Sequence, residues 1–350
     1  LQLLKLVLDK GAIHAEMRRF NIDWGSKLED FLDLYFGEGM SSIWTSGEST
    51  LAINNEQHDL GEFAKSTRRA QAGERLFFIP AQRVMSLRDG STRPFTDYRS
   101  GDPFALREFS EKLHQLVQNE FSRTEGLFPQ NNRLNAALRE PIAKHIFGGF
   151  GVKTDAEQFQ KRIVLGQEGK KPLPYLVWSA GQREFVPLLL GFYWLMPPGG
   201  TSNRDELRWV VIEELEMGLH PNAISAVLSL VMELLSRGYK VCLSTHSPHV
   251  LDVVWALQFM KEHKGNVRDV LGLFELKSNP RSKQMAANVL KKTYKVYFFE
   301  RGGVVKDISN LDPGAEDSAE SGWGGLSGFS GHVADVVSKV SNRYEKEKEE

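Results

Sequence analysis

The chain has 350 residues, 41% of them hydrophobic and 25% charged, which is the composition of an ordinary globular protein. Its 44 lysines and arginines nearly balance 45 aspartates and glutamates, so no overall basic excess points to nucleic acid. The single cysteine, Cys242, excludes an intrachain disulfide framework and indicates a reducing compartment, which we take to be the cytoplasm. The longest apolar runs, such as 186–196, fall short of the ~20 residues of a membrane span, so no membrane partner is expected.

The chain opens on Leu1 and runs directly into LQLLKLVLDK. Apolar residues at positions 1, 3, 4, 6, 7 and 8 predict a helix that is buried on most sides. Because no capping residue precedes this helix, we expect a further segment upstream of Leu1. Two short strands are then predicted at 49–55 and 75–80.

A more polar and helical stretch follows. One helix is predicted over 102–123, with Asp102 as its cap and Pro103 at its first position, and a second over 132–146. We interpret 96–175 as a helical insertion in an α/β domain. The segments 1–95 and 176–335 then form the two parts of the main lobe, and 336–350 is a charged tail.

The segment 173–277 has the most regular pattern. It predicts helices over 179–195, 221–237 and 248–261, and strands over 208–212 and 239–245. This alternation predicts a parallel sheet with helices on both faces. Further on, 295–308 is typical of a hairpin that turns at 301–303. No internal repeat and no sustained heptad is found.

Acidic residues follow the strand at 208–212. Glu213 and Glu214 are adjacent, and in parallel sheets ligands bind at the carboxyl ends of strands. Two neighbouring carboxylates are costly to hold together unless a cation uses them. In such a position the first acid holds Mg²⁺ and the second deprotonates an attacking water. A solvated acidic turn is the simpler alternative.

Three further motifs add candidates. His246 follows the strand at 239–245 and can donate a hydrogen bond to a terminal phosphate, although a histidine in such a place is usually structural. Ser179 and Gly181 open a helix, where a hydroxyl, an amide and the helix N-terminus together bind anions, although SAG before a helix is more often a plain cap. After the strand in FFIPAQR, Gln82 can contact Mg²⁺ or water and Arg83 a phosphate; a plain strand exit explains the same residues equally well.

The order FIPAQR, SAGQRE, VVIEELEMGLHP and STHSPHVLD resembles the ABC-class ATPases, and more narrowly the AAA-type ATPases grouped with the OLD, RecF and SMC proteins. By this resemblance Glu213 and Glu214 end the Walker B strand, SAGQRE is the signature motif and GLHP is the D-loop. His246 matches the switch histidine and Gln82 the Q-loop glutamine. The resemblance covers roughly 75–275. It implies an ABC-type P-loop NTPase sheet with a helical subdomain, ATP and Mg²⁺ as ligands, and ATP hydrolysis.

The sequence departs from the family pattern at three points. Glu213 stands where aspartate is usual, and Leu215 replaces a common proline. The phosphate-binding loop GxxxxGK[ST] is absent, and GEGMSS at 37–42, which lacks a lysine and a preceding strand, is interpreted as a turn. In the family that loop opens a helix resembling LLQLL, so we expect the loop just upstream of Leu1. ATPase activity is expected only with that loop, because it supplies most phosphate contacts.

The resemblance also implies partners. Two subunits, or a higher homo-oligomer, would enclose ATP head to tail, with Ser179 and Gly181 of one subunit facing the nucleotide held by the acids of the other. A separate effector protein is expected, and antiphage defence is a common setting in this family.

Two alternatives remain open. One is a non-catalytic assembly scaffold derived from such an ATPase, which the absent lysine favours if the native protein lacks the loop. The other is a DNA-binding recombination or repair ATPase, with DNA as a partner. This second alternative predicts a basic stripe formed by Arg68, Arg69, Arg75, Arg83 and Arg88.

Overall fold

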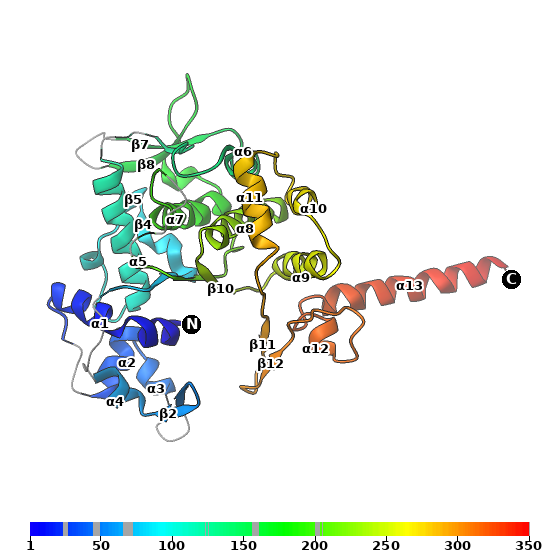
Figure 1. Ribbon diagram of the computed structural model, residues 1–350, viewed down its shortest axis with the longest axis horizontal. Coiled ribbons are helices and arrows are strands. Elements are labelled where there is room, and N and C mark those ends of the chain that lie inside the picture. The colour runs from blue at the N-terminus through cyan, green and yellow to red at the C-terminus, as the bar shows by residue number, and fades with distance from the viewer. Residues whose placement is uncertain are drawn as a thin grey trace.

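The computed structural model describes residues 1–23, 27–44, 50–65, 73–122, 124, 126–155, 161–199, 204 and 206–349. Helices surround a small central sheet, and a long C-terminal helix extends away from the rest of the molecule (Figure 1). The helices of the main body are α1 (Gln2–Arg19), α2 (Leu28–Phe36), α3 (Met40–Ile43), α4 (Leu60–Lys65), α5 (Phe104–Gln115), α6 (Ala136–His145), α7 (Ala180–Leu195), α8 (Pro221–Ser236), α9 (Pro248–Glu262), α10 (Val267–Leu273) and α11 (Pro280–Val289).

The central sheet has three parallel strands in the order β10-β9-β3. They are β3 (Leu76–Ile79), β9 (Trp209–Glu213) and β10 (Lys240–Ser244). Trp209 pairs with both Leu76 and Lys240, so the three strands begin level and end at one common edge. Helix α8 is the crossover between β9 and β10, as a parallel pair requires. The predicted parallel sheet is confirmed.

Both faces of this sheet are apolar, and side chains alternate between them. One face packs into the main core with α5, α7 and α8, through Phe77, Ile79, Val210 and Ile212. The other face, through Leu76, Phe78 and Val211, packs against Leu4 and Leu8 of α1. The sheet is therefore an inner layer with helices on both sides, as predicted.

The elements from α7 to α9 begin and end within one residue of their predicted bounds. Local signals explain this agreement. Ser179 forms a capping box with Gln182 at the start of α7, and Pro221 and Pro248 occupy the first turns of α8 and α9. Each helix therefore has a fixed starting residue that does not depend on the rest of the fold.

The predicted helical insertion at 96–175 also contains an antiparallel sheet. Its order is β6-β7-β8, formed by β6 (Gly126–Phe128), β7 (Gly151–Asp155) and β8 (Arg162–Gly166). The predicted helix at 102–123 starts at Phe104 and passes into a π-helical turn, η3 (Leu116–Glu120), while Asp102 accepts the Arg99 N–H and does not cap the helix. Side chains of this sheet belong to the same hydrophobic core as α7 and α8.

Short elements complete the main body. They are the hairpins β1 (Leu51–Ile53) with β2 (Glu56–His58) and β4 (Leu87–Arg88) with β5 (Ser91–Thr92), and the 3₁₀ helices η1 (Ala81–Ser86), η2 (Phe95–Asp97) and η5 (Tyr175–Val177). GEGMSS forms a turn that leads into α3, as predicted, with Gly39 at φ 89°. Ser49, in the predicted strand 49–55, lies outside the described residues.

Helix α1 is less buried than predicted on its apolar side and carries buried charges instead. Lys5 and Asp9 are fully buried, whereas Leu1 is exposed. The helix is kinked at Asp9, whose carboxylate accepts the backbone N–H groups of Arg75 (2.8 Å) and Leu76 (2.9 Å). The Lys5 ammonium donates to the Leu76 carbonyl oxygen (2.9 Å). These bonds join α1 to the first residue of β3.

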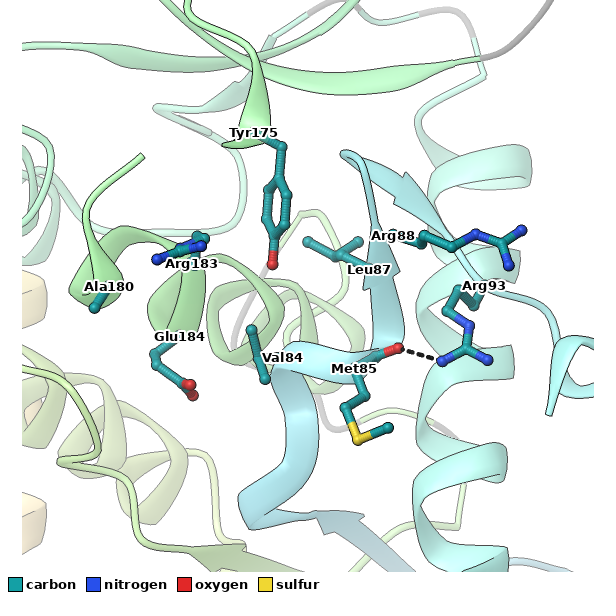
Figure 2. Close-up of a pocket in the computed structure, with 9 residues that line it drawn as sticks. All are labelled: Val84, Met85, Leu87, Arg88, Arg93, Tyr175, Ala180, Arg183 and Glu184. Carbon is teal, nitrogen blue, oxygen red and sulfur yellow. Dashed lines mark hydrogen bonds between the residues drawn. The ribbon is translucent and has the colours of Figure 1, made fainter. Parts of the chain in front are cut away.

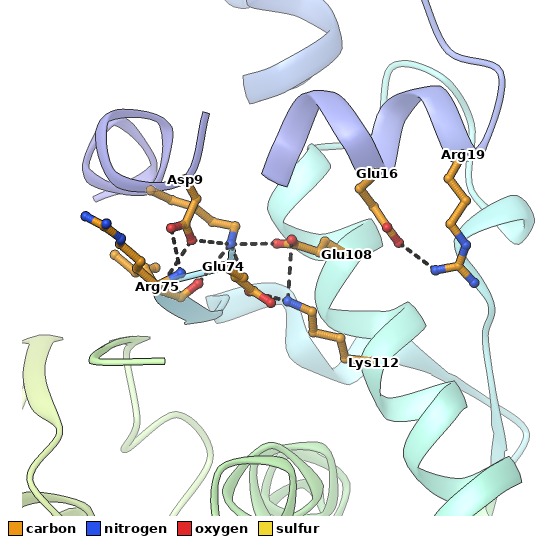
Figure 3. Close-up of polar contacts among 9 residues, drawn as sticks. Asp9, Glu16, Arg19, Glu74, Arg75, Glu108 and Lys112 are labelled. Carbon is orange, nitrogen blue, oxygen red and sulfur yellow. Dashed lines mark hydrogen bonds and ion pairs between the residues drawn. The ribbon is translucent and has the colours of Figure 1, made fainter. Parts of the chain in front are cut away.

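The buried ammonium of Lys5 is the centre of a larger charge cluster, of which Figure 3 shows Asp9, Glu74, Glu108 and Lys112. It lies 3.0 Å from the carboxylate of Glu108 on α5, 3.2 Å from that of Glu74 and 3.3 Å from that of Asp9. Lys112 contacts both Glu74 and Glu108. Burial raises the pKa of Glu108, and Lys112 and Lys5 oppose this rise. The cluster ties together α1, α5 and the start of β3.

The C-terminal arm, residues 296–349, follows α11. The predicted hairpin is confirmed as β11 (Tyr297–Phe299) paired with β12 (Val305–Asp307), and α12 (Ser318–Ser321) follows it. A small cluster of Ile308, Leu311 and Ala319 packs against Val254 of α9. The predicted charged tail at 336–350 belongs to α13 (Gly328–Glu349), which is helical and extends away from the molecule (Figure 1). Within the described part of the chain, no helix is long and apolar enough to span a membrane.

Candidate functional site

Several predicted site residues lie at the carboxyl edge of the central sheet. Glu213 is the last residue of β9 and pairs in register with Ser244 at the end of β10. Beyond β3, the Ala81 N–H donates to Glu213 Oε2 (3.2 Å), and the exposed Gln82 follows directly. The sheet thus brings Gln82, Glu213, Glu214 and His246 to one edge, as their positions after strands predict.

Glu214 has an unusual backbone conformation. Its φ is +45°, in the left-handed region that costs a residue with a side chain roughly 1–2 kcal/mol. Its N–H donates to the Ser244 carbonyl oxygen (3.0 Å), which extends the pairing of β9 and β10 by one bond. Its carboxylate Oε1 lies 3.7 Å from His246 Nε2. Strained residues of this kind cluster at functional sites.

Glu216 is a site residue that the sequence analysis did not single out. Its Oε1 accepts hydrogen bonds from Thr245 Oγ1 (2.8 Å) and from the His246 N–H (2.7 Å). The His246 side chain itself is 82% exposed, so Glu216 holds its backbone while leaving the imidazole free. The sequence does contain a signal for Glu216, because it is the third acid of the motif EELE. A carboxylate at that position can reach the loop that follows the neighbouring strand, β10.

Replacing Glu216 with alanine should lower the free energy of unfolding by about 1.5–3 kcal/mol, because two donors to a carboxylate lose their acceptor. Glu216→Gln keeps a side-chain oxygen at the same place and should cost less than half of that. Urea unfolding of the two variants measures the difference. Equal losses would show that the acceptor does not hold the His246 loop.

The electrostatics of this edge favour a cation. Burial raises the pKa of Glu213, the Ala81 N–H lowers it, and Glu214 raises it further. Among the described residues, no group of three or more His, Cys, Asp and Glu side chains is arranged as a metal site.

Arg83 does not have the predicted role of a phosphate ligand. It is fully buried, and its guanidinium donates to the carbonyl oxygens of Glu213 (3.0 Å), Glu214 (3.0 Å) and Glu184 (3.3 Å). All three guanidinium nitrogens therefore serve to join η1, β9 and α7. Its burial also removes one member of the predicted basic stripe, of which Arg68 and Arg69 lie outside the described residues.

Ser179 and Gly181 lie at the start of α7. The Ser179 hydroxyl caps the Gln182 N–H, and the side chain is exposed. A Cβ on Gly181 would lie 2.9 Å from the Gly218 carbonyl oxygen, so only glycine lets α7 pack this closely on the turn after β9. The Ser179 hydroxyl and backbone N–H bond to Gln182 of the same helix, whereas Glu213 bonds to Ala81 and Glu214 lies beside His246.

A pocket of about 420 Å³ lies between the start of α7 and the segment 84–93 (Figure 2). Val84, Met85 and Leu87 give it an apolar side, and Tyr175 points into it. The remaining lining residues are Arg88, Arg93, Ala180, Arg183 and Glu184. Since Ala180 follows Ser179, this pocket adjoins the signature-like motif.

A family model described as "AAA domain, putative AbiEii toxin, Type IV TA system" matches residues 57–252, more than half of the 350 residues. The matched range contains β3, α7, β9 and β10, and with them every predicted site residue. No curated protein and no solved structure matches the chain. The chain therefore belongs to this family of AAA domains, within the AAA and P-loop ATPase superfamily.

Proposed function

We propose that the chain is an ABC-type ATPase subunit of the OLD/RecF/SMC-like group, which binds ATP with Mg²⁺ at the carboxyl edge of the sheet and hydrolyses it. The position of Glu214 carries this proposal. Its carboxylate is held at a strained backbone position, 3.7 Å from His246 and next to a second acid at the end of a buried strand. What separates Glu214 from other residues at positive φ, such as Glu275, is its place after a buried strand and beside His246.

Each site residue of one chain would have a separate role in ATP hydrolysis. The bound Mg²⁺ ion, when present, supplies positive charge to the phosphates. Glu213 is the carboxylate that would hold it, and Gln82, exposed beside it, would contact the ion or the water. Glu214 would take the proton of the attacking water, and His246 would donate a hydrogen bond to the terminal phosphate. Further phosphate contacts would come from a phosphate-binding loop, which supplies most of them in this family.

A second subunit would complete the site. The Ser179 hydroxyl, at the start of α7, is exposed and bonds to Gln182 of its own helix. Arg83 connects α7 to β9 through the Glu184 and Glu213 carbonyl oxygens, so α7 keeps a fixed position relative to its own acidic edge. We therefore infer that Ser179 and Gly181 face the nucleotide of a partner in a head-to-tail dimer. ATP would join the two chains and hydrolysis would release them.

The output of this cycle would pass to a separate effector protein. The description of the matching family names a putative AbiEii toxin of a Type IV toxin–antitoxin system, and we propose toxin–antitoxin or antiphage defence as the setting. The chain would then be the ATPase that controls the effector.

Mixing two inactive variants tests the head-to-tail arrangement, in a chain that carries the phosphate-binding loop. Glu214→Gln lacks the base. Ser179→Asp keeps an N-cap of equal quality but places a negative charge against the partner's phosphate. Each variant alone should be nearly inactive. Their equimolar mixture should recover about a quarter of the wild-type rate, because half of the random pairs contain one intact composite site.

Ser179→Thr is the control, because it keeps both the cap and the hydroxyl and should retain most activity. A mixture that is no more active than its components would refute the composite site. Full activity of Ser179→Asp alone would exclude any contact between α7 and the phosphates.

A further inference from the structure

Helix α13 has a long apolar side that is exposed in the described part of the chain. Every described side chain between 330 and 345 is exposed, and Phe329 is 78% exposed. The exposed apolar residues recur at intervals of three and four and so line one side of the helix, namely Phe329, Val333, Val336, Val337, Val340 and Tyr344. We call these six residues the α13 stripe. A side of this kind is normally covered.

The stripe has a basic edge. At 100° per residue, His332, Lys339 and Arg343 lie along one margin of it, and serines lie along the other. Val337 and Tyr344 make the stripe wider than the apolar seam of a two-stranded coiled coil. In an antiparallel α13 pair the basic edges would face each other, and in a parallel pair they would face Val337 and Tyr344. Neither pairing provides carboxylates for Lys339 and Arg343.

The hairpin of the C-terminal arm has an uncovered apolar face as well. Phe299 pairs with Val305, and Tyr297 lies two residues before Phe299, so these three side chains share one face. All three are exposed, Phe299 by 74%. The opposite face is covered, because Phe298 packs with Trp323 and the cluster at Ile308. A two-stranded hairpin is only marginally stable, so an uncovered apolar face on it is unfavourable.

Acidic residues follow this hairpin. The segment 307–320 contains no lysine or arginine, and its carboxylates are Asp307, Asp312, Glu316, Asp317 and Glu320. Asp312, Glu316 and Asp317 are exposed. The arm therefore carries an apolar face beside an acidic segment, which is the counterpart of the stripe and its basic edge.

We propose that the α13 stripe of one chain packs on the apolar hairpin face of a second copy, and that the exchange is reciprocal. The basic edge would then face the acidic segment of that copy. Helix α13 runs away from its own arm (Figure 1), so its own hairpin is out of reach of the stripe. A reciprocal exchange is satisfied by a two-fold axis, the commonest symmetry of homodimers.

This dimer needs no nucleotide and is independent of the proposed ATP site. It would hold two ATPase subunits together before ATP binds, so that the second contact forms within one assembly and at a raised effective concentration. Its failure would leave the head-to-tail proposal untouched, because the two contacts involve different surfaces.

The test is the mass of the full chain in solution without nucleotide, measured by light scattering. The wild-type chain should have the mass of two copies. The double variant Val336→Glu/Val340→Glu should be a monomer, because two charges would enter the apolar contact. Glutamate is a good helix former and both valines are exposed, so helix content should not change. Ser338→Glu, on the opposite side of α13, is the matched control and should remain a dimer.

Two further variants identify the surface that receives α13. Phe299→Ser should also give a monomer, and a dimer that survives it would refute the hairpin as the receiving face. Lys339→Glu/Arg343→Glu should weaken the dimer at least tenfold, and adding Asp312→Lys/Glu316→Lys to it should restore association. Lack of restoration, or a monomeric wild-type chain at micromolar concentration, would overturn the proposal.

Discussion

Replacing Glu214 with glutamine should lower ATP turnover by about 10²–10⁴-fold while ATP binding persists. The amide has nearly the size of the carboxylate and keeps the side chain beside His246, but it cannot accept the proton of an attacking water. The loss should therefore appear in kcat and not in KM. In a chain with the phosphate-binding loop, the variant should accumulate as an ATP-bound dimer, because the step that releases the partners is blocked.

Steady-state hydrolysis and light scattering with ATP and Mg²⁺ measure these two effects. The matched control is Glu275→Gln, since Glu275 is another glutamate at positive φ (51°) but is exposed and far from the acids in sequence. The control should behave as wild type. A Glu214→Gln variant that turns over ATP at the normal rate would exclude Glu214 as the base.

Replacing Lys5 with methionine should lower the free energy of unfolding by about 3–5 kcal/mol, a large part of the stability of most domains. Methionine fills nearly the same volume, so the loss comes from charge and not from a cavity. Without the ammonium, the buried carboxylates of Asp9 and Glu108 lose their common partner, and the Leu76 carbonyl oxygen loses its donor. Breaking a buried ion pair from one side leaves an uncompensated charge in the interior.

Urea unfolding of Lys5→Met and of Lys283→Met provides the comparison. Lys283 is exposed on α11, and its replacement should change stability by less than about 0.5 kcal/mol. Adding Glu108→Gln to Lys5→Met should recover part of the loss, because without Lys5 the carboxylates of Glu74 and Glu108 share Lys112, and the substitution removes one of these two charges. Equal stability of the two lysine variants would mean that the cluster contributes nothing.

The sequence predicts the central part of the fold because its signals there are local. Pro221 and Pro248 set the starts of two helices, and short apolar runs ending in acids or in His246 set the strands. Once those strands are parallel, their ends must meet, so the positions of Glu213, Glu214 and His246 follow without knowledge of the rest.

The parts that the sequence does not predict depend on contacts between distant residues. Arg83 is typical of an exposed phosphate ligand, and only the fold shows that it is enclosed by carbonyl oxygens 101 to 131 residues further along. Lys5 and Asp9 lie within an apolar helix, and from the sequence they are expected to be exposed to solvent. Only the packing of β3 and α5 around them shows that they are buried. The sheet β6-β7-β8 is missed because its strands have three to five residues and lie among polar segments.

The contacts that Lys5 and Asp9 make around the kink of α1 also protect the protein from aggregation. Strand β3 is at the margin of the sheet, and its sequence LFFI has no charge, no proline and a high tendency to pair with other strands. Lys5 and Asp9 occupy both hydrogen-bonding groups of Leu76 that point away from β9. The side chains of Lys5 and Asp9 therefore block the edge of β3 to which a strand of another chain could otherwise hydrogen-bond. When α1 is loosened, the expected outcome is aggregation through this exposed strand as well as simple unfolding.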